Sequence, residues 1–583
     1  MLKSMLAFSF LVATVVGHCQ TNIKLTNTSV SDILQGNYNP NDYQSSVSFN
    51  DPHAIAAELT DRIKADSLYS YLKRMSSFQT RNTGSDTVSN VRGIGAAMRW
   101  AHHMFEKFSA ENEGRLQVSF LQFDRNICGV TQHKNVLAVL PGKQTQDAGG
   151  SQTGVIIIEA HLDSRCNISC DTNCLAEGME DNGSGSALVM ELARVMAKYE
   201  YNRTIVFMLT TGEEQGLHGA EAMAKYCEDN TIPVAAVLNN DVIGGVICGE
   251  TSSPPSCPSE NNVDSTQVRL FSAGSFNSPS KQLARYIKLQ YEEELKAHVD
   301  VEQALTIMTA EDRSGRGGDH IPFRVAGYPA MRFTSANEHG DASNGPNYDD
   351  RQHTSEDILG LDTDNDGQLD SFFVDFNYLA RNAAINANAA TMIAQNVCSD
   401  LSFEAEQRTW NKARVNIGGD FCASPPFRIA YRTETNDWDT IVTVTENTAE
   451  VLIKPGLNHF FSVCRVNEDG IESLFSAEQF LATVGVDEQP EQTGIELLQN
   501  RPNPFDESTM ISFVVHDRPL SDKALITITD VHGQVIQRMT TPITMGINEV
   551  LYDHGYGKVG TYFYNLIIDG KTIDTKKMVF VAY

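Results

Sequence analysis

The chain has 583 residues, of which 41% are hydrophobic, and a formal net charge of −29. At about 150 residues a domain, this length allows three or four domains, and the composition excludes collagen-like, coiled-coil and wholly disordered proteins. The 74 acidic side chains outnumber the 45 basic ones and would repel phosphate backbones and anionic lipid surfaces, so no nucleic-acid partner is expected.

The N-terminus has the pattern of an export signal. Lys3 is followed by an almost wholly apolar stretch, Met5–Val16, and then by polar sequence, as in a secretory signal peptide. We expect this signal to span residues 1–20, and no later run reaches the ~18 apolar residues of a transmembrane segment. Residues 21–50 are polar and lack clear periodicity, so they are expected to be an arm or propeptide outside the core.

Cysteine usage agrees with export. One of the eleven cysteines, Cys19, lies in the signal, and the remaining ten are an even number, which favours disulfide bonds. Spacings of four separate Cys166, Cys170 and Cys174, unlike the two-residue gaps of a zinc ribbon, so thiolate metal binding is the less favoured alternative. A Ser/Pro loop between Cys248 and Cys257 suits a local bridge.

The first large unit is expected over residues 51–398. Apolar residues recur at helical spacing in 52–75 and in 91–108, which predicts two amphipathic helices. Short apolar runs then alternate with helical stretches, a rhythm that predicts an α/β domain with a mixed twisted sheet flanked by helices. The expected strands are 135–140, 155–159, 204–210 and 235–239, and the expected helices between them are 185–199 and 216–228.

Beyond residue 399 the sequence lacks long helical patterns. Short strands separated by Asn, Asp and Gly turns predict a small antiparallel β-sandwich over 399–483. An acidic stretch, 484–496, is interpreted as a linker, and a last sandwich-like β unit is expected over 497–583, with hairpin turns at His532-Gly533 and Asp569-Gly570. The expected strands of the first sandwich are 427–432, 441–445, 449–453 and 460–466.

Side chains that can bind metal follow three of the predicted buried strands and occupy one helix-entering loop. In open α/β sheets the carboxyl ends of the strands form the ligand crevice. Several carboxylates crowded there would repel one another and raise each other's pKa unless cations are present. The side chains concerned are His161, Asp163, Asp181, Glu213, Glu214 and Asp241.

Two zinc ions fit the charge of this set together with His353. Three carboxylates and one shared hydroxide would cancel the charge of two Zn²⁺ ions, and neutral imidazoles would add none. Mixed imidazole and carboxylate ligands suit zinc better than calcium. Glu213, next in sequence to a ligand, can take a proton from water, and Asp163 is placed to accept the second N–H of His161 and orient it.

The motifs resemble those of the secreted bacterial dizinc aminopeptidases, which are relatives of glutamate carboxypeptidase and glutaminyl cyclase. They occur in the family's order, and the resemblance covers roughly residues 51–398. The motifs are His161-Leu162-Asp163, Glu180-Asp181-Asn182-Gly183-Ser184-Gly185, Gly212-Glu213-Glu214, Asn240-Asp241 and His353-Thr354 with Asp357.

The resemblance implies a zinc exopeptidase fold and peptide substrates. It also implies that His161 and Asp241 bind one zinc, that Glu214 and His353 bind the other, and that Asp181 bridges the two. Glu213 would then be the catalytic base.

One segment departs from the family. Its Ser-Asp-His motif is replaced here by Gly318-Asp319-His320, and no tyrosine precedes it at the spacing that some relatives use for oxyanion support. The oxyanion-stabilising group is therefore left unassigned. His320 is a candidate for lining the substrate pocket or for a structural role. Arg313 and Arg316 could clamp a substrate carboxylate, as a carboxypeptidase requires, or lie in a solvated loop.

A separate acidic motif suggests calcium. Asp362, Asp364 and Asp366 alternate before a glycine and resemble the first half of an EF-hand loop, with Asp370 close behind. The twelfth position is Phe373 rather than glutamate, so a structural calcium site and a plain acidic turn both remain open.

The accessory units also resemble known modules. The region 399–483 resembles a fibronectin type III domain, and the last unit, with Asn503-Pro504-Phe505 near its start, resembles the C-terminal sorting domains of the type IX secretion system. The latter resemblance implies type IX machinery as a partner and a secreted or cell-surface protein, the alternative being a second generic β module.

The expected function is an exported zinc exopeptidase that removes N-terminal amino acids from peptides. A carboxypeptidase or a glutaminyl cyclase on the same scaffold is one alternative, and a surface adhesin with an inert peptidase-like domain is another. The adhesin would be expected to lack some ligands, yet every expected ligand is present in the sequence.

Overall fold

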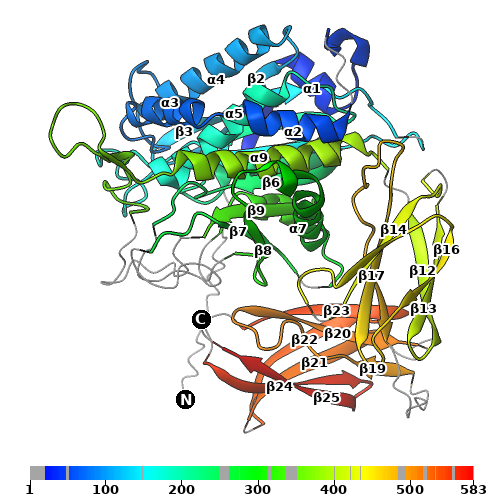
Figure 1. Ribbon diagram of the computed structural model, residues 1–583. Coiled ribbons are helices and arrows are strands. Elements are labelled where there is room, and N and C mark those ends of the chain that lie inside the picture. The colour runs from blue at the N-terminus through cyan, green and yellow to red at the C-terminus, as the bar shows by residue number, and fades with distance from the viewer. Residues whose placement is uncertain are drawn as a thin grey trace, which may run out of the picture.

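The computed structural model describes most of the chain (Figure 1). The described residues are 20–46, 51–147, 149–247, 262–274, 276–312, 317–336, 351–398, 401–419, 422–433, 435–482, 494–516, 522–531, 533–554 and 558–581. Residues 1–19 of the predicted signal peptide, the loop between Cys248 and Cys257, and Arg313 and Arg316 lie outside these residues. Within the described ranges, no helix combines the length and apolar character that crossing a membrane requires.

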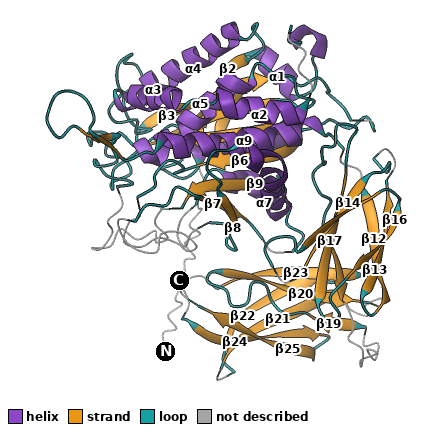
Figure 2. Ribbon diagram, in the orientation of Figure 1, coloured by secondary structure: helices purple, strands orange, loops and turns teal. Residues whose placement is uncertain are grey.

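A mixed sheet forms the centre of the α/β unit, and helices cover both of its faces (Figure 2). The four central strands run parallel in the order β5-β4-β6-β9, and antiparallel strands continue the sheet on both sides. In sheet order the strands are β1 (Thr21–Leu25), β2 (Gln117–Ile127), β3 (Val130–Leu140), β5 (Ile205–Thr210), β4 (Val155–His161), β6 (Val234–Asn240), β9 (Ala330–Ser335), β7 (Gln267–Ser272) and β8 (Ala304–Ile307).

Burial alternates along the central strands. Ile156 and Ile158 of β4 contribute to the hydrophobic core on one face of the sheet, whereas Val155 and Ile157 contribute to the core on the other. Strands buried on both faces have continuous apolar sequences. This pattern is the reason that the central strands could be predicted from the sequence. The first face is covered by α2 (Pro52–Arg62), α3 (Ala65–Ser76), α4 (Gly93–Glu111), α5 (Gly185–Met196), α7 (Pro279–Gln290) and α9 (Phe376–Gln395), and the second by α1 (Thr28–Leu34), α6 (His218–Asp229) and α8 (His320–Val325).

Two expectations about the N-terminal region are wrong. The segment expected to be an arm outside the core adds the edge strand β1 to β2 and buries Val30, Ile33 and Leu34 of α1. These three apolar residues have helical spacing that the polar composition around them obscured. The single helix expected over 52–75 is divided into α2 and α3, because Ile63 and Lys64 between them have extended backbone angles.

Two β units follow the α/β unit, as expected. The first packs β12 (Ser402–Thr409), β13 (Lys412–Gly418) and β16 (Thr448–Leu452) against β15 (Thr440–Val444), β14 (Phe427–Arg432), β17 (Asn458–Arg465) and β18 (Gln479–Ala482). The second packs β19 (Ile495–Leu497), β20 (Ser508–Val515) and β23 (Gly546–Asp553) against β22 (Val535–Pro542), β21 (Lys523–Asp530), β24 (Gly560–Ile568) and β25 (Lys571–Phe580).

The predicted Asp569-Gly570 turn joins β24 to β25, and both residues have positive φ, as a two-residue hairpin requires. His532 of the other predicted turn lies outside the described residues.

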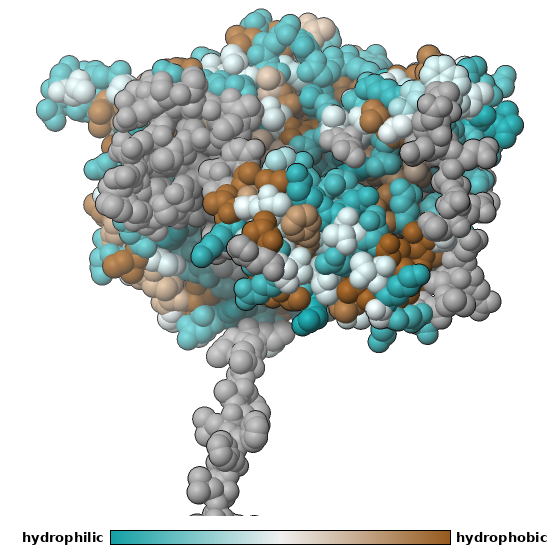
Figure 3. Space-filling view, turned by 90° about the horizontal axis from the view of Figure 1, so that it is seen from below, coloured by the Kyte–Doolittle hydropathy of each residue, from teal (hydrophilic) through white to brown (hydrophobic). Residues whose placement is uncertain are grey.

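On the lower face of the molecule, apolar residues form separate patches among hydrophilic ones (Figure 3).

A buried ion cluster attaches the first β unit to the α/β unit. The Glu478 carboxylate accepts hydrogen bonds from Arg285 Nη1 of α7 at 3.0 Å and from Arg432 Nη2 at 2.8 Å. All three side chains are almost completely shielded from solvent. A carboxylate so placed between two guanidiniums compensates charges that would otherwise be buried alone.

Replacing Glu478 with alanine should destabilise the protein by about 3–5 kcal/mol, because two buried guanidiniums lose their counterion. Chemical denaturation followed by circular dichroism measures this change. The matched control is Glu450→Ala, which removes an exposed carboxylate that pairs with Lys412 on the surface and should leave the midpoint unchanged. Equal midpoints for the two variants would contradict the role given to the buried cluster.

Candidate metal centre

The centre lies at the carboxyl ends of the central parallel strands. His161 is the last residue of β4, Asp241 directly follows β6, and the Glu213-Glu214 pair follows β5. Because these strands run parallel, their carboxyl ends meet at one edge of the sheet. At the turn after β5, Gly212 has a φ of +81°, a conformation that favours glycine.

Asp181 comes from a short helical turn, η2 (Met179–Ser184), which leads into α5. The start of α5 packs tightly on the end of β6: a Cβ atom added at Gly185 would lie 2.2 Å from the carbonyl oxygen of Asn240. Asp357 accepts hydrogen bonds from the backbone N–H groups of Glu180, at 2.8 Å, and Asp181, at 3.0 Å. This contact joins the turn to the segment that carries His353.

The two histidines lie on opposite sides of the Asp181 carboxylate. His161 Nε2 is 3.1 Å from Asp181 Oδ1, and His353 Nε2 is 3.0 Å from Asp181 Oδ2. His161 Nε2 is also 3.4 Å from Asp241 Oδ1, and His353 Nε2 is 3.2 Å from Glu214 Oε2. The structure therefore brings together all five residues predicted as metal ligands, in two groups that share Asp181.

The donor set fits divalent metal. Ligand atoms of His161, Asp181 and Glu214 lie within 4.8 Å of one another, as do those of His161, Glu213 and Asp241. Glu214 Oε1 is buried without a hydrogen-bond partner in the described part of the chain. Buried carboxylates without partners are costly, and imidazole with carboxylate is a donor set that zinc accepts.

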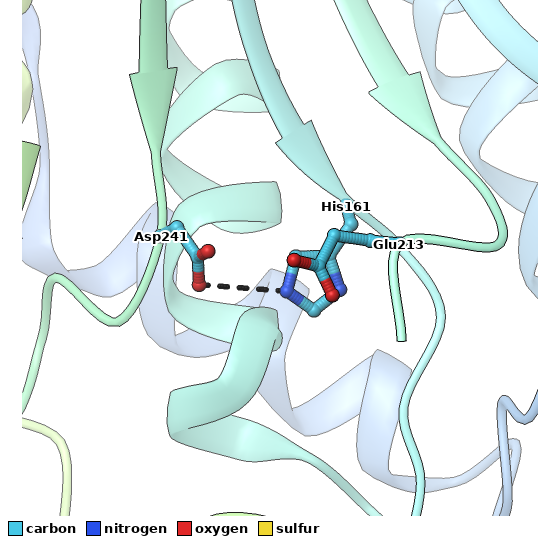
Figure 4. A group of neighbouring side chains, drawn as sticks. All are labelled: His161, Glu213 and Asp241. Atoms are coloured by element: carbon cyan, nitrogen blue, oxygen red, sulfur yellow. Dashed lines mark ion pairs between the residues drawn. The ribbon is translucent and has the colours of Figure 1, made fainter. Parts of the chain in front are cut away.

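Glu213 lies against His161 and Asp241 (Figure 4). Burial raises the pKa of the Glu213 carboxyl well above its ordinary value, and the neighbouring Asp241 carboxylate raises it further, against the opposing effect of His161. For His353, burial lowers the pKa, but Glu214 and Asp181 outweigh it and raise the pKa to about 9. These two groups therefore hold their protons more strongly than usual, whereas the neighbouring histidines lower the pKa of Asp181 despite its burial.

The prediction that the Asp163 carboxylate orients His161 is wrong in detail. His161 Nδ1 donates to the backbone carbonyl of Asp163 at 3.1 Å, while the Asp163 carboxylate lies 3.8 Å away. That carboxylate accepts instead from the backbone N–H groups of Glu213 and Glu214, each at 3.3 Å, and from the Thr83 hydroxyl at 3.0 Å. Asp163 thus fixes the loop after β5, because its carboxylate reaches across to that neighbouring strand end.

Sequence reasoning missed two buried arginines behind the centre. Arg81 donates from Nε to the carbonyl of Leu162 at 2.7 Å and from Nη2 to that of Gly178 at 2.9 Å. It therefore ties the loop after β4 to the turn that carries Asp181. Arg332 of β9 lies with Nη2 3.4 Å from Asp241 Oδ2. Neither arginine belongs to a recognisable motif, so no local signal could have found them.

The remaining candidates lie away from the five ligands. His320 is fully buried on α8, with Nε2 3.2 Å from the backbone oxygen of Glu311, which favours its structural reading over pocket lining. The acidic motif forms a separate, largely exposed loop between the short strands β10 (Gly360–Leu361) and β11 (Ser371–Phe372). There, ligand atoms of Asp362, Asp364 and Asp370 lie within 4.8 Å of one another, while Asp366 accepts from the N–H of Gln368.

The cysteine triplet forms disulfides, so the alternative of thiolate metal binding is excluded. Cys166 pairs with Cys174, and Cys170 pairs with Cys128 at the β2–β3 turn. Both bonds fix the loop beside the centre. Further along the chain Cys398 pairs with Cys422, while Cys227 and Cys464 are buried free thiols.

Asp357→Ala should destabilise the protein by about 1–3 kcal/mol for each N–H of the Asp181 turn that it leaves unsatisfied. Thermal unfolding monitored by calorimetry checks this. Glu356→Ala, which removes an exposed carboxylate from the neighbouring residue, is the control and should leave the unfolding temperature unchanged. An Asp357→Ala protein as stable as this control would contradict the anchoring role.

Comparison with known proteins agrees with this centre. The model of Peptidase family M28 matches residues 135–372. A probable zinc metalloprotease of Pyrenophora tritici-repentis is 31% identical over 301 residues, which are 49% of this chain and 67% of the relative. A probable zinc metalloprotease of Leptosphaeria maculans is 31% identical over 347 residues, 58% of this chain and 75% of the relative. Both relatives are fungal, whereas the motifs resembled those of bacterial enzymes.

Solved structures with a similar fold include the LapA aminopeptidase of Legionella pneumophila, with a TM-score of 0.42 and 20% identity, covering 60% of this chain and 78% of that one. The glutaminyl cyclase of Porphyromonas gingivalis has a TM-score of 0.36 and 16% identity, covering 57% of this chain and 98% of that one. Identity of about 30% over two thirds or more of the two fungal relatives, together with the matching family model, establishes that this chain belongs to peptidase family M28.

Proposed function

We propose that the protein is a zinc exopeptidase that removes N-terminal residues from peptides and uses two zinc ions. His161 and Asp241 would hold one ion, Glu214 and His353 the other, and Asp181 would bridge them. The observation that carries this proposal is that the two Asp181 oxygens each face a different histidine, at 3.1 and 3.0 Å. A carboxylate in that position can serve two ions at once.

When bound, the zinc pair supplies Lewis acidity that polarises the scissile carbonyl and lowers the pKa of the attacking water. Glu213 would accept the proton of that water and deliver it to the leaving amine. The environment suits this role, because burial raises the pKa of the Glu213 carboxyl. A carboxyl group with a raised pKa can keep the proton taken from water until the leaving amine accepts it. Asp163 would keep Glu213 in place through its backbone N–H.

The choice of substrate end rests on the resemblance of the motifs to those of dizinc aminopeptidases. Two buried carboxyl groups that the proposed ligand set does not use, Glu159 and Asp319, lie near the centre, but burial raises the pKa of both, that of Asp319 to about 7. They therefore add little negative charge to the site. One observation supports the second candidate, a carboxypeptidase: the Arg165 guanidinium at the centre is partly exposed and could receive a carboxylate. A glutaminyl cyclase remains an alternative on the same scaffold.

We also propose that the protein is exported and works outside the cell. Three disulfide bonds among the described residues support an oxidising compartment. The signal peptide, the fibronectin type III likeness, the type IX sorting role of the last unit and a calcium ion at the acidic loop all stay predictions from the sequence. An inert adhesin is disfavoured because the five proposed ligands converge.

Asp181→Ala and Glu213→Gln separate metal binding from catalysis. Asp181→Ala should lose at least one zinc, because the bridge serves both ions, and its hydrolysis rate should fall at least ~10³-fold. Glu213→Gln should keep both ions and still lose ~10²–10⁴-fold in rate, as expected for removal of a general base. Elemental analysis and turnover of an aminoacyl anilide measure the two effects. Full zinc content or normal turnover in Asp181→Ala would overturn the proposal.

A matched pair of peptides tests the substrate end. A free-amino peptide should be hydrolysed from its N-terminus, and the same peptide carrying an N-acetyl group should resist, because acylation removes the ammonium charge. Mass spectrometry of the products identifies the end that is cleaved. Release of C-terminal residues from the acetylated peptide would favour the carboxypeptidase, and loss of ammonia from an N-terminal glutamine would favour the cyclase.

A further inference from the structure

Two side chains of the turn η2 bond to the backbone of the loop that follows β6. Glu180 Oε1 accepts hydrogen bonds from the N–H of Gly244 at 3.1 Å and from that of Gly245 at 2.7 Å. Ser184 Oγ accepts from the N–H of Ile243 at 3.2 Å. These three loop residues are buried, and buried backbone N–H groups require partners. The turn η2 therefore supplies bonds that the loop needs to keep its path.

A third side chain of the same turn, that of Asn182, bonds to both sides of Asp241. Its Nδ2 donates to the carbonyl of Asn240 at 2.8 Å, and its Oδ1 accepts from the N–H of Val242 at 3.4 Å. The same oxygen accepts from the N–H of Gly185 at 2.9 Å, which fixes the amide against the start of α5. One fully buried side chain thus holds the two peptide groups that flank a proposed zinc ligand.

The loop is held in a conformation that its sequence disfavours. Val242, directly after Asp241, has a φ of +54°, in the left-handed region that β-branched residues seldom adopt. A residue keeps such a conformation only where the surrounding contacts enforce it. Two of these contacts are the bond from the Val242 N–H to Asn182 and the bond from the N–H of Ser335 to the Val242 carbonyl, at 2.8 Å. Loss of the contacts from η2 would let Val242 relax and turn Asp241 away.

These contacts concern one zinc site rather than both. The four proposed ligands other than the bridge form a first site and a second site, which are His161 with Asp241 and Glu214 with His353. Among these four residues, Asp241 is the one on the loop after β6. The bridge, Asp181, is held separately, because its N–H donates to Asp357 at 3.0 Å.

We propose that Glu180, Asn182 and Ser184 are positioning residues of the first zinc site. Together they keep Val242 in its strained conformation and so hold the Asp241 carboxylate in the direction of the first ion. They act through the backbone of the loop after β6, so their effect falls on the first site and spares the second. This inference rests on the two-zinc function proposed above.

Zinc titration of single-site proteins tests the inference without using activity. His353→Ala retains the ligands of the first site, and His161→Ala retains those of the second. Each protein is prepared alone, with Glu180→Ala and with Glu180→Gln, stripped with a chelator, and titrated with zinc against a competing chromophoric chelator. Circular dichroism checks that each protein is folded.

Glu180→Ala should weaken zinc binding about tenfold or more in the His353→Ala protein, as is typical when a group that orients a metal ligand is removed. In the His161→Ala protein it should leave the affinity almost unchanged. Glu180→Gln is the matched control, because it removes the same charge but keeps an oxygen that can accept from the loop, and its affinity should stay close to that of the parent. Asn182→Ala should show the same preference for the first site as Glu180→Ala.

Equal losses at the two sites, or no loss at the first site in folded Glu180→Ala, would overturn the inference and leave the two-zinc function intact. A loss in Glu180→Gln as large as that in Glu180→Ala would also overturn it, because charge rather than position would then be the cause. A wild-type protein that binds fewer than two zinc ions, or a single-site protein that binds none, would instead overturn the proposed ligand set and the inference with it.

Discussion

The concentration of buried carboxylates at one edge of the central sheet is the constraint on which the rest of the centre depends. Parallel strands deliver Glu214 and Asp241 to the same place, and Asp181 enters from the turn before α5. Carboxylates this close cannot all be ionised in a buried site without positive charge among them. The contacts around the centre therefore serve to place positive charge next to these carboxylates.

Positive charge is arranged in two layers. The proposed zinc ions would neutralise the ligand carboxylates. Buried arginines contact either those ligands or the backbone of the loops that carry them. Arg332 lies against Asp241, and Arg81 bonds to the backbone of the loops that carry His161 and Asp181. Arg165 donates to Glu214 Oε2 and has Nη2 2.8 Å from His353 Nδ1.

Much of the centre could be predicted from the sequence because its ligands follow apolar strands in short motifs. The strand ends fixed the places of His161, Glu214 and Asp241, and the family resemblance added His353 from a distant segment. The role of Asp163 could not be predicted, because its partners lie on a neighbouring strand end rather than two residues away. Arg81 and Arg332 act through tertiary contacts that leave no local pattern. The helix α1 was missed because its three buried apolar residues lie within a polar segment.

Anomalous X-ray scattering at the zinc absorption edge, from crystals of the zinc-loaded protein, tests the central claim most directly. The account predicts two peaks about 3.5–4 Å apart, one beside His161 and Asp241 and the other beside His353 and Glu214, with the Asp181 carboxylate between them. A single peak, or peaks away from Asp181, would contradict it.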